Sequence, residues 1–280
     1  MQIAIQGELG SFSHEAALSL APEATILPCA FSAQVFDLVA SGEAAGVIPI
    51  ENSLAGSVVE HFDLLFRKDV RIEAESLLRI RHNLIGLPGS KIESIRRVSS
   101  HPVALAQCRR FFQSHPHMQP VPAYDTAGSV KDLAGTGDRT AAAIASSHAA
   151  RFYQGEILAA GIEDDPANYT RFFLIRRSDL VRAPENACKV SIAFMVENRP
   201  GSLVEALQLF SESRANLSKI ESRPVLGRPW EYVFYADYQT APPAGEHGTP
   251  DGILDHLRQK CLAVKELGRY MAAANPWEPA

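Results

Sequence analysis

The sequence predicts an α/β protein in which a larger strand-and-helix body precedes a small ferredoxin-like module. From Gln2 to Ile175, short apolar runs alternate with amphipathic segments, the pattern of a mostly parallel sheet covered by helices. The alternation stops near residues 178–189, a polar, proline-containing stretch that we interpret as a linker. Beyond it the elements follow in the order βαββαβ, within under about 100 residues. With 280 residues, 46% of them hydrophobic, the chain can bury a large core divided among two or three domains.

The body is predicted from short apolar strands and from helices with apolar residues at 3.6-residue spacing. The strands fall at residues 3–5, 25–27, 46–50, 84–87, 97–99, 121–123, 142–145 and 171–175. The helices fall at residues 31–39, 55–65, 103–112, 127–133 and 148–152. Because helices separate successive strands, most strands are expected to pair in parallel.

The C-terminal module is predicted to contain four strands and two helices. Its strands fall at residues 190–196, 217–223, 231–238 and 264–270. A turn at residues 198–202 leads into a helix with Leu203, Leu207 and Phe210 on one face, and a Pro/Gly-rich loop spans residues 240–249. The second helix, residues 253–261, places Ile253, Leu254, Leu257 and Cys261 on one face.

Composition excludes several classes of protein. No apolar run approaches the ~20 residues of a membrane helix, and a strand pattern begins at Gln2 without a basic leader, so we expect a cytoplasmic protein. The net charge of −5 argues against nucleic-acid binding. The cysteines are scattered singly in apolar segments and are expected to be buried thiols, not disulfides or metal ligands: Cys29, Cys108, Cys188 and Cys261.

Polar segments follow five of the predicted strands. They are residues 7–13, 51–53, 99–102, 125–126 and 146–147, and each has the composition of a helix N-cap. Capping alone would explain any one of them. Because the carboxyl ends of strands in an α/β sheet line one crevice, and helix N-termini offer free N–H groups, the five together predict a site for a small anion.

The segment from Asn168 to Phe173 places a hydroxyl and a guanidinium beside an apolar run. Strand alternation puts Thr170 and Phe172 on one face and Arg171 on the other. The segment can therefore be an anion receptor with one apolar wall, or an ordinary strand start whose arginine faces water.

These motifs, in this order and spacing, resemble the prephenate dehydratase family over essentially the whole chain. The matching segments are Gly7-x-x-Gly10-Ser11-Phe12-Ser13, Pro49-Ile50-Glu51-Asn52-Ser53, Ser100-His101-Pro102, Asp125-Thr126-Ala127 and Asn168-x-Thr170-Arg171-Phe172. The C-terminal module resembles an ACT regulatory domain, in which Ser202 replaces the family's usual alanine. The resemblance implies a catalytic domain at residues 1–180, a linker at 181–188 and an ACT domain at 189–275. It also implies a two-lobed catalytic body like a type II periplasmic binding protein, with lobe A at about 1–80 plus 160–180 and lobe B at about 81–159.

The resemblance implies that the protein converts prephenate to phenylpyruvate, with loss of water and CO2, in L-phenylalanine biosynthesis. No metal and no cofactor is expected, because the reaction is driven by aromatisation. Phenylalanine is the implied feedback effector, and pairing of ACT modules implies a homodimer or a dimer of dimers. Arogenate dehydratase activity and a non-catalytic amino-acid sensor are the alternatives.

Family roles carry over to named residues. Thr170 is the implied proton donor, Arg171 binds a substrate carboxylate or organises the cleft, and Phe172 walls the ring or belongs to the core. Glu51 is expected to hold Arg171 or a loop amide, and His101 is a second acid or a cap. The implied substrate-binding residues are Ser11, Glu51, Asn52, Ser53, Ser100, His101, Thr126, Ser146 and Asn168. The implied effector-binding residues are Asn198, Pro200, Gly201, Ser202, Leu203, Val204, Glu221, Ser222, Arg223 and Pro224.

Overall fold

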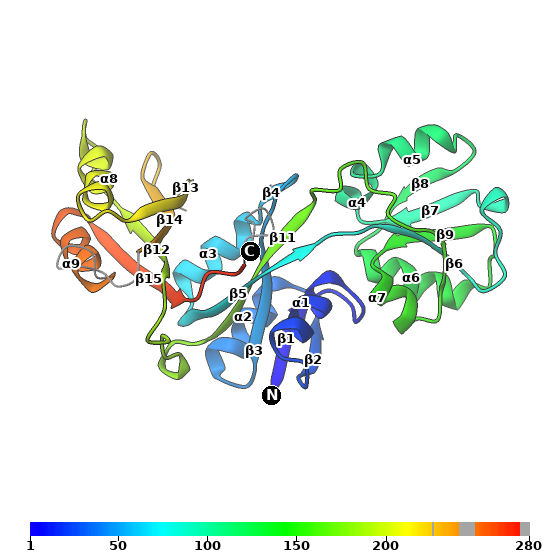
Figure 1. Cartoon of the computed structure of the whole chain (residues 1–280), viewed down its shortest axis with the longest axis horizontal. Helices are drawn as coiled ribbons and strands as arrows, with labels where there is room; N and C mark the ends of the chain where they lie inside the picture. The colour runs from blue at the N-terminus through cyan, green and yellow to red at the C-terminus, as the bar shows by residue number, and fades with distance from the viewer. Residues whose placement is uncertain (226, 241–249, 275–280) are drawn as a thin grey trace. The chain divides into compact units, whose positions relative to one another are not determined.

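The structure is a computed structural model that describes residues 1–225, 227–240 and 250–274 (Figure 1). The chain forms two compact units. The first unit comprises Met1–His61 with Ser76–Phe173, and the second comprises Phe62–Glu75 with Leu174–Ala280. The division falls within β5 (Val70–Arg79) and β11 (Tyr169–Arg177), so both strands contribute residues to each unit.

In the first unit, one sheet is built on a parallel arrangement of the N-terminal strands. Strand β1 (Gln2–Gln6) pairs in parallel with both β2 (Thr25–Cys29) and β3 (Ala45–Asn52). Helices α1 (Phe12–Leu20) and α2 (Ser32–Ser41) pack on this sheet. A short strand, β4 (Gly56–Ser57), turns back antiparallel to the end of β3.

A second sheet of the first unit has the order β10-β6-β9-β7-β8. Strands β7 and β9 are parallel, whereas β6 and β10 run antiparallel to their neighbours. Helices cover both faces because alternate residues of each strand point to opposite sides. Leu84 and Ile144 pack in one cluster with Ala104 of α4, whereas Ile85 and Ala143 pack in another with α6 and α7. The elements are β6 (Asn83–Gly86), β7 (Arg97–Ser100), α4 (Pro102–Ala106), α5 (Arg109–Ser114), β8 (Gln119–Pro122), α6 (Thr126–Thr136), β9 (Ala141–Ala145), α7 (Ser147–Phe152) and β10 (Glu156–Ala159).

Every strand and helix predicted for the body is present, with two differences in the helices. The helix predicted at residues 103–112 is two helices, because both carboxylate oxygens of Asp164 accept hydrogen bonds from Arg109 N and Arg110 N and start α5 anew. The helix predicted at 55–65 begins later, as α3 (Val59–Arg67). Strands β4, β5 and β10 were not predicted. Strand β4 has only two residues, polar residues interrupt β5, and the apolar residues of β10 form a run of only three.

The second unit confirms the predicted βαββαβ order. It runs through β12 (Lys189–Met195), α8 (Ser202–Glu212), β13 (Asn216–Pro224), β14 (Tyr232–Gln239), α9 (Pro250–Lys260) and β15 (Ala263–Tyr270). The strands are antiparallel in the order β13-β14-β12-β15. Apart from Thr240, the predicted loop at 240–249 lies outside the described residues. The predicted linker begins with a short 3-10 helix, Ser178–Leu180.

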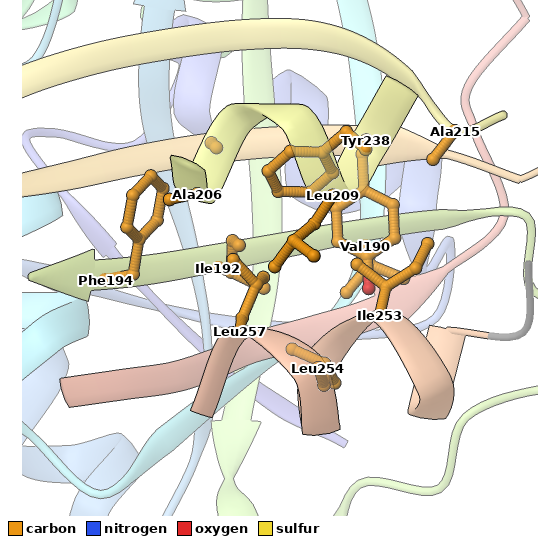
Figure 2. Close-up of a cluster of buried hydrophobic side chains, with 12 residues drawn as sticks. Val190, Ile192, Phe194, Ala206, Leu209, Ala215, Tyr238, Ile253, Leu254 and Leu257 are labelled. Carbon is orange, nitrogen blue, oxygen red and sulfur yellow. The ribbon is translucent and has the colours of Figure 1, made fainter. Parts of the chain in front are cut away.

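Every second side chain of one strand points into the core of this module. Val190, Ile192 and Phe194 of β12 point toward α8 and α9, where Leu209 and Leu257 meet them (Figure 2). The predicted helix faces are confirmed, since their residues pack in this cluster: Leu203, Leu207 and Phe210 in α8, and Ile253, Leu254, Leu257 and Cys261 in and after α9.

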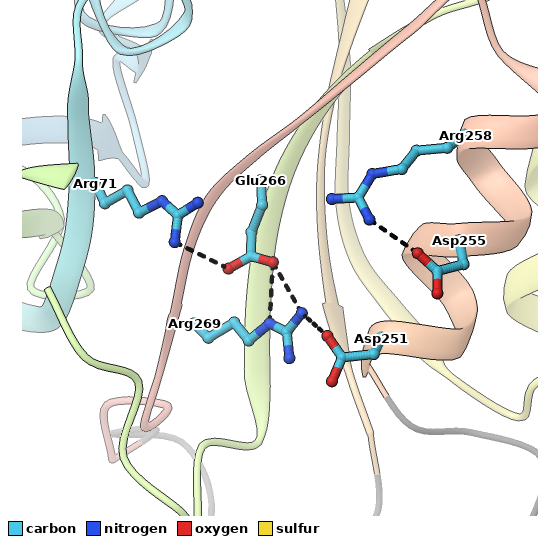
Figure 3. A network of polar contacts seen from close by, with 6 residues as sticks. All are labelled: Arg71, Asp251, Asp255, Arg258, Glu266 and Arg269. Atoms are coloured by element: carbon cyan, nitrogen blue, oxygen red, sulfur yellow. Dashed lines mark hydrogen bonds and ion pairs between the residues drawn. The ribbon is translucent and has the colours of Figure 1, made fainter. Parts of the chain in front are cut away.

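Charged contacts join distant segments of the second unit. The Glu266 carboxylate of β15 accepts hydrogen bonds from the Arg269 guanidinium and lies 4.0 Å from Arg71 of β5 (Figure 3). Arg269 also pairs with Asp251 at the start of α9. No helix in the described part of the chain is both long and apolar enough to span a membrane.

Candidate functional site

A pocket of about 440 Å³ lies in the first unit. Its lining comes from the segments that follow β1, β3, β5 and β7, from the start of α6, and from Thr170 and Phe172 of β11. Segments far apart in sequence therefore meet there. Four of the five polar segments predicted to line one crevice contribute residues to the pocket, and residues 146–147 do not.

Four of the five predicted N-caps are confirmed. The Ser11, Asp125 and Ser146 side chains accept hydrogen bonds from the first turns of α1, α6 and α7, and the His101 ring accepts one from Val103 N at α4. Helices α1 and α6 thus begin at the pocket, where Ser11 and Thr126 line it. The caps already bind His14 N in α1 and Gly128 N in α6, and the remaining N–H groups of these first turns can attract an anion.

The prediction that residues 51–53 open a helix is wrong. Asn52 ends β3, and its side-chain oxygen accepts hydrogen bonds from Leu54 N and Ala55 N in a turn toward β4. Its amide nitrogen donates to Thr170 Oγ1 at 3.0 Å and to Asn168 Oδ1 at 2.7 Å. Because Thr170 Oγ1 accepts this hydrogen bond, its own proton remains available for a ligand.

A relay of amides extends from Asn52 to a buried histidine. Gln107 Oε1 lies 2.9 Å from Asn168 Nδ2 and 2.9 Å from His82 Nε2. Gln107 and His82 both line the pocket. Sequence reasoning missed these two residues, because Gln107 fell inside a predicted helix and His82 lay between predicted elements. For Gln107 the available signal was a polar residue among apolar neighbours, whereas His82, between Arg81 and Asn83, gave no such signal.

The strand that carries Thr170 has the predicted alternation. Thr170 and Phe172 are buried and line the pocket. The Arg171 guanidinium instead lies 4.6 Å from the Phe173 ring centre, and Arg171 is not among the residues that line the pocket. Among the lining residues there is no lysine or arginine, so hydroxyl, amide, imidazole and backbone N–H groups must supply the polar contacts.

Three predicted serines hold loops around the pocket without lining it. Ser100 Oγ donates to Ile144 O at 2.6 Å, Ser146 Oγ donates to Gly10 O at 2.9 Å, and Ser53 Oγ donates to Ala167 O at 3.0 Å. Glu51 is half-buried and lies opposite Ser57 in the β3–β4 pair. Its predicted contact with Arg171 stays a prediction.

Burial shifts the titration of two groups that line the pocket. The pKa of the Asp125 carboxyl is raised by burial, against the opposing effect of its hydrogen bonds from Gly128 N and Ala127 N. The pKa of His82 is lowered by burial, which outweighs its hydrogen bond to Gln107. Both shifts favour the uncharged forms of these groups.

The predicted effector residues lie in two segments of the second unit. The first is the turn into α8, where Gly201 is the N-cap with a φ of 88°, and Ser202 Oγ donates to Glu197 O at 2.6 Å. The same turn includes the exposed residues Asn198, Pro200 and Val204 and the half-buried Leu203. The second segment ends β13, where Glu221 pairs with Lys219 and Arg223 pairs with Asp63, beside Ser222 and Pro224. Their role in binding an effector stays a prediction.

The fold and the site define an α/β protein with a polar and aromatic ligand pocket, joined to a ferredoxin-like module. Comparison with known proteins identifies the family within this class. The family model for prephenate dehydratase matches residues 3–180. The chain therefore belongs to the prephenate dehydratase family.

Individual relatives are similar along the whole chain. The arogenate dehydratase/prephenate dehydratase 2 of Arabidopsis thaliana is 36% identical over 280 residues, which cover 96% of this chain and 72% of that protein. The structure of a prephenate dehydratase from Arthrobacter aurescens in complex with L-Phe is 32% identical, with a TM-score of 0.86 over 97% of this chain and 90% of that one. A structure described as a novel type of quorum-quenching acylase is 33% identical, with a TM-score of 0.88 over 99% of each chain.

Proposed function

We propose that this protein is a prephenate dehydratase, a carbon–oxygen lyase that converts prephenate to phenylpyruvate, water and CO2. Membership in the family supports the reaction. The observation that carries the proposal is the Thr170 hydroxyl, which lines the pocket and accepts a hydrogen bond from Asn52 Nδ2 at 3.0 Å.

The reaction needs one proton for the departing hydroxyl. As the ring C–O bond breaks, the Thr170 proton moves to the hydroxyl oxygen, which leaves as water with the bonding electron pair. The ring carboxylate departs as CO2, and the electrons of its C–C bond complete the aromatic ring. A solvent proton then restores Thr170, so the overall reaction consumes one proton.

The surroundings of Thr170 fit this role. A threonine hydroxyl is a weak acid, and the Asn52 amide stabilises the oxygen as it loses its proton. Phe12 and Phe172 line the pocket and can pack against the substrate ring, while the first turns of α1 and α6 can bind its carboxylates. Arg171 would then organise the strand through Phe173, without touching the substrate.

The test is incubation of the purified chain with prephenate at neutral pH while phenylpyruvate is followed by absorbance. Thr170→Val should lower kcat by at least about 100-fold without unfolding the protein, since it removes the proton donor. Thr25→Val, in the exposed first position of β2, is the matched control and should leave turnover unchanged. Normal turnover in Thr170→Val would overturn the assignment.

Two other activities follow from the relatives. The plant relative carries both arogenate and prephenate dehydratase in its name, and arogenate has an amine where prephenate has a ketone. The similarity to a structure described as an acylase adds hydrolysis of an acyl amide as a candidate activity. Parallel assays with prephenate, arogenate and an acyl amide, compared by kcat/KM, rank the three activities directly.

We further propose that L-phenylalanine inhibits the enzyme by binding the second unit of a homodimer or a dimer of dimers. The relative that was solved with L-Phe supports this, as does the ferredoxin-like order of the module. Phenylalanine must then favour one conformation of the protein over another. Turnover measured against phenylalanine concentration, with sedimentation of the same samples, tests both statements. An unchanged rate would refute the inhibition, and a monomer would refute the assembly.

A further inference from the structure

The imidazole of His82 carries a polar atom that the fold does not satisfy. His82 is 2% exposed and lines the pocket, and its Nδ1 is buried with no hydrogen-bond partner among the described residues. A buried polar atom left without a hydrogen bond is unfavourable. A ligand in the pocket is the natural partner for this atom.

The relay decides which nitrogen of His82 carries the proton. Gln107 Oε1 accepts a hydrogen bond from Asn168 Nδ2, which identifies that atom as the oxygen of the side-chain amide. His82 Nε2, 2.9 Å from the same oxygen, must therefore donate. In the neutral ring favoured by burial, Nδ1 then presents a lone pair.

The position of the ring is fixed from several sides. The backbone N–H of His82 donates to Glu163 Oε2 at 2.9 Å. The Phe12 ring meets the imidazole edge-on, with ring centres 5.8 Å apart. Together with the hydrogen bond to Gln107, these contacts hold Nδ1 as a preformed acceptor.

The substrate of the proposed reaction, on which this inference rests, has a single hydrogen-bond donor when both carboxylates are ionised. That donor is the ring hydroxyl, the group that must leave. We propose that His82 Nδ1 accepts a hydrogen bond from the ring hydroxyl of the substrate and thereby turns a lone pair of its oxygen toward the Thr170 proton.

This contact would help the chemical step. A hydroxyl that donates a hydrogen bond gains electron density on oxygen, so it accepts a proton from Thr170 more readily. The imidazole keeps its own proton throughout, and its acceptor then holds the departing water. His82 is thus a further catalytic residue, since it touches the reacting hydroxyl.

Two isosteric variants separate contact with the substrate from support of the relay. In His82→Asn, the amide can place its oxygen near the position of Nδ1 but cannot reach Gln107. In His82→Gln, the longer amide can donate to Gln107 near the position of Nε2 but leaves no acceptor at the position of Nδ1. His117→Gln, on an exposed loop, is the control.

We expect His82→Gln to lower kcat about 10- to 100-fold, the effect of one lost hydrogen bond. We expect His82→Asn to retain most of the wild-type kcat. The opposite order of the two variants would assign His82 to the relay alone and overturn the inference.

Binding of two stable probes gives a readout that does not depend on turnover. 4-Hydroxyphenylpyruvate carries a ring hydroxyl and phenylpyruvate does not. The wild-type chain should bind the hydroxylated probe more tightly, and its ¹⁵N-labelled His82 Nδ1 should shift with that probe only. Equal affinities and no selective shift would overturn the inference even if every His82 variant failed to fold. A wild-type chain that binds the probes in this way but does not turn over prephenate would instead refute the proposed function.

Discussion

At Thr170, the direction of one hydrogen bond decides what the side chain can do. Asn52 Nδ2 donates to Thr170 Oγ1, and the same nitrogen donates to Asn168 Oδ1. If Thr170 had to donate to a protein acceptor, its proton would be engaged and the substrate would have to displace that contact. The amide of Asn52 therefore matters because it can only donate at that nitrogen.

Replacing Asn52 with aspartate tests this directional argument. Asn52→Asp is nearly isosteric, but its carboxylate can only accept, so the Thr170 hydroxyl would donate to it. We expect kcat to fall about 100-fold or more, which corresponds to roughly 3 kcal/mol of lost transition-state stabilisation. Asn216→Asp, at the exposed start of β13, is the control. Comparable loss in the control, or none in Asn52→Asp, would contradict the argument.

At the scale of the element, the loop between β1 and α1 depends on a glycine. Gly10 has a φ of 86°, and a Cβ added there would lie 2.9 Å from Ala149 Cα in α7. Ser146, which caps α7, donates to Gly10 O. The loop that carries Ser11 and Phe12 to the pocket is therefore seated against the first turn of α7.

Gly10→Ala should both destabilise the protein and impair the pocket. The positive φ and the clash with the backbone of Ala149 should together lower the free energy of unfolding by about 2 kcal/mol or more. A lower midpoint of denaturant unfolding would measure this loss. Turnover should fall as well, because Ser11 and Phe12 would shift. Gly135→Ala is the matched control: Gly135 lies within α6, a Cβ there meets nothing within 4 Å, and alanine should be neutral or stabilise by up to about 1 kcal/mol. The argument fails if both variants unfold alike.

A buried ion pair couples two strands of the second unit. Lys189 of β12 and Glu75 of β5 are about nine-tenths buried, and Lys189 Nζ lies 2.9 and 3.0 Å from the two carboxylate oxygens. Glu75 Oε1 also accepts a hydrogen bond from Ala273 N at 2.9 Å. Glu75 therefore links β5 both to β12 and to a backbone N–H near the C-terminal end of the described chain.

Removing one charge of this pair should lower the free energy of unfolding more than removing both charges. Lys189→Met leaves a buried carboxylate without its cation and should lower the free energy of unfolding by about 3–5 kcal/mol. Adding Glu75→Gln should restore a large part of that loss, since the uncompensated charge is gone. Urea unfolding of both variants measures the difference, and equal losses would show that the charge is not the cause.

At the scale of the whole molecule, buried histidines make stability depend on pH. Burial lowers the pKa of His14, His61 and His82, with a further lowering of His14 by His148. In the unfolded chain these groups bind protons near their ordinary pKa of about 6.5. Between that value and their lowered folded values, the unfolded state binds more protons than the folded state.

The contribution of these histidines to the free energy of unfolding should therefore be complete above about pH 6.5. It should decrease as the pH falls below about 6.5 toward the lowered pKa values of the folded state. Thermal or urea unfolding between about pH 7.5 and 5 measures this, and the three neutral histidines predict a steeper fall than one group alone. His61→Gln, at a fully buried site away from the lining of the pocket, should flatten the curve. A stability that rises on acidification would contradict the assignment.

Much of this could be predicted from the sequence. Apolar runs defined the strands, N-cap residues marked the helix starts, and the alternation in Tyr169–Arg177 placed Thr170 and Phe172 on the face opposite Arg171. Strand β5 was not predicted because polar residues alternate with its apolar residues, so that it contains no continuous apolar run. His82 and Gln107 escaped because a side chain's partners across the fold leave no mark in its own neighbourhood.

The sequence by itself determined the α/β class, the βαββαβ module, the family and the identity of the hydroxyl in the pocket. These depend on local periodicity, capping and motif order, which neighbouring residues set. The tertiary structure alone decided that Asn52 turns its amide to Thr170, that Gln107 connects Asn168 to His82, and that His82 keeps an unsatisfied acceptor in the pocket wall. Such hydrogen-bond directions exist only once distant strands pack together and exclude water.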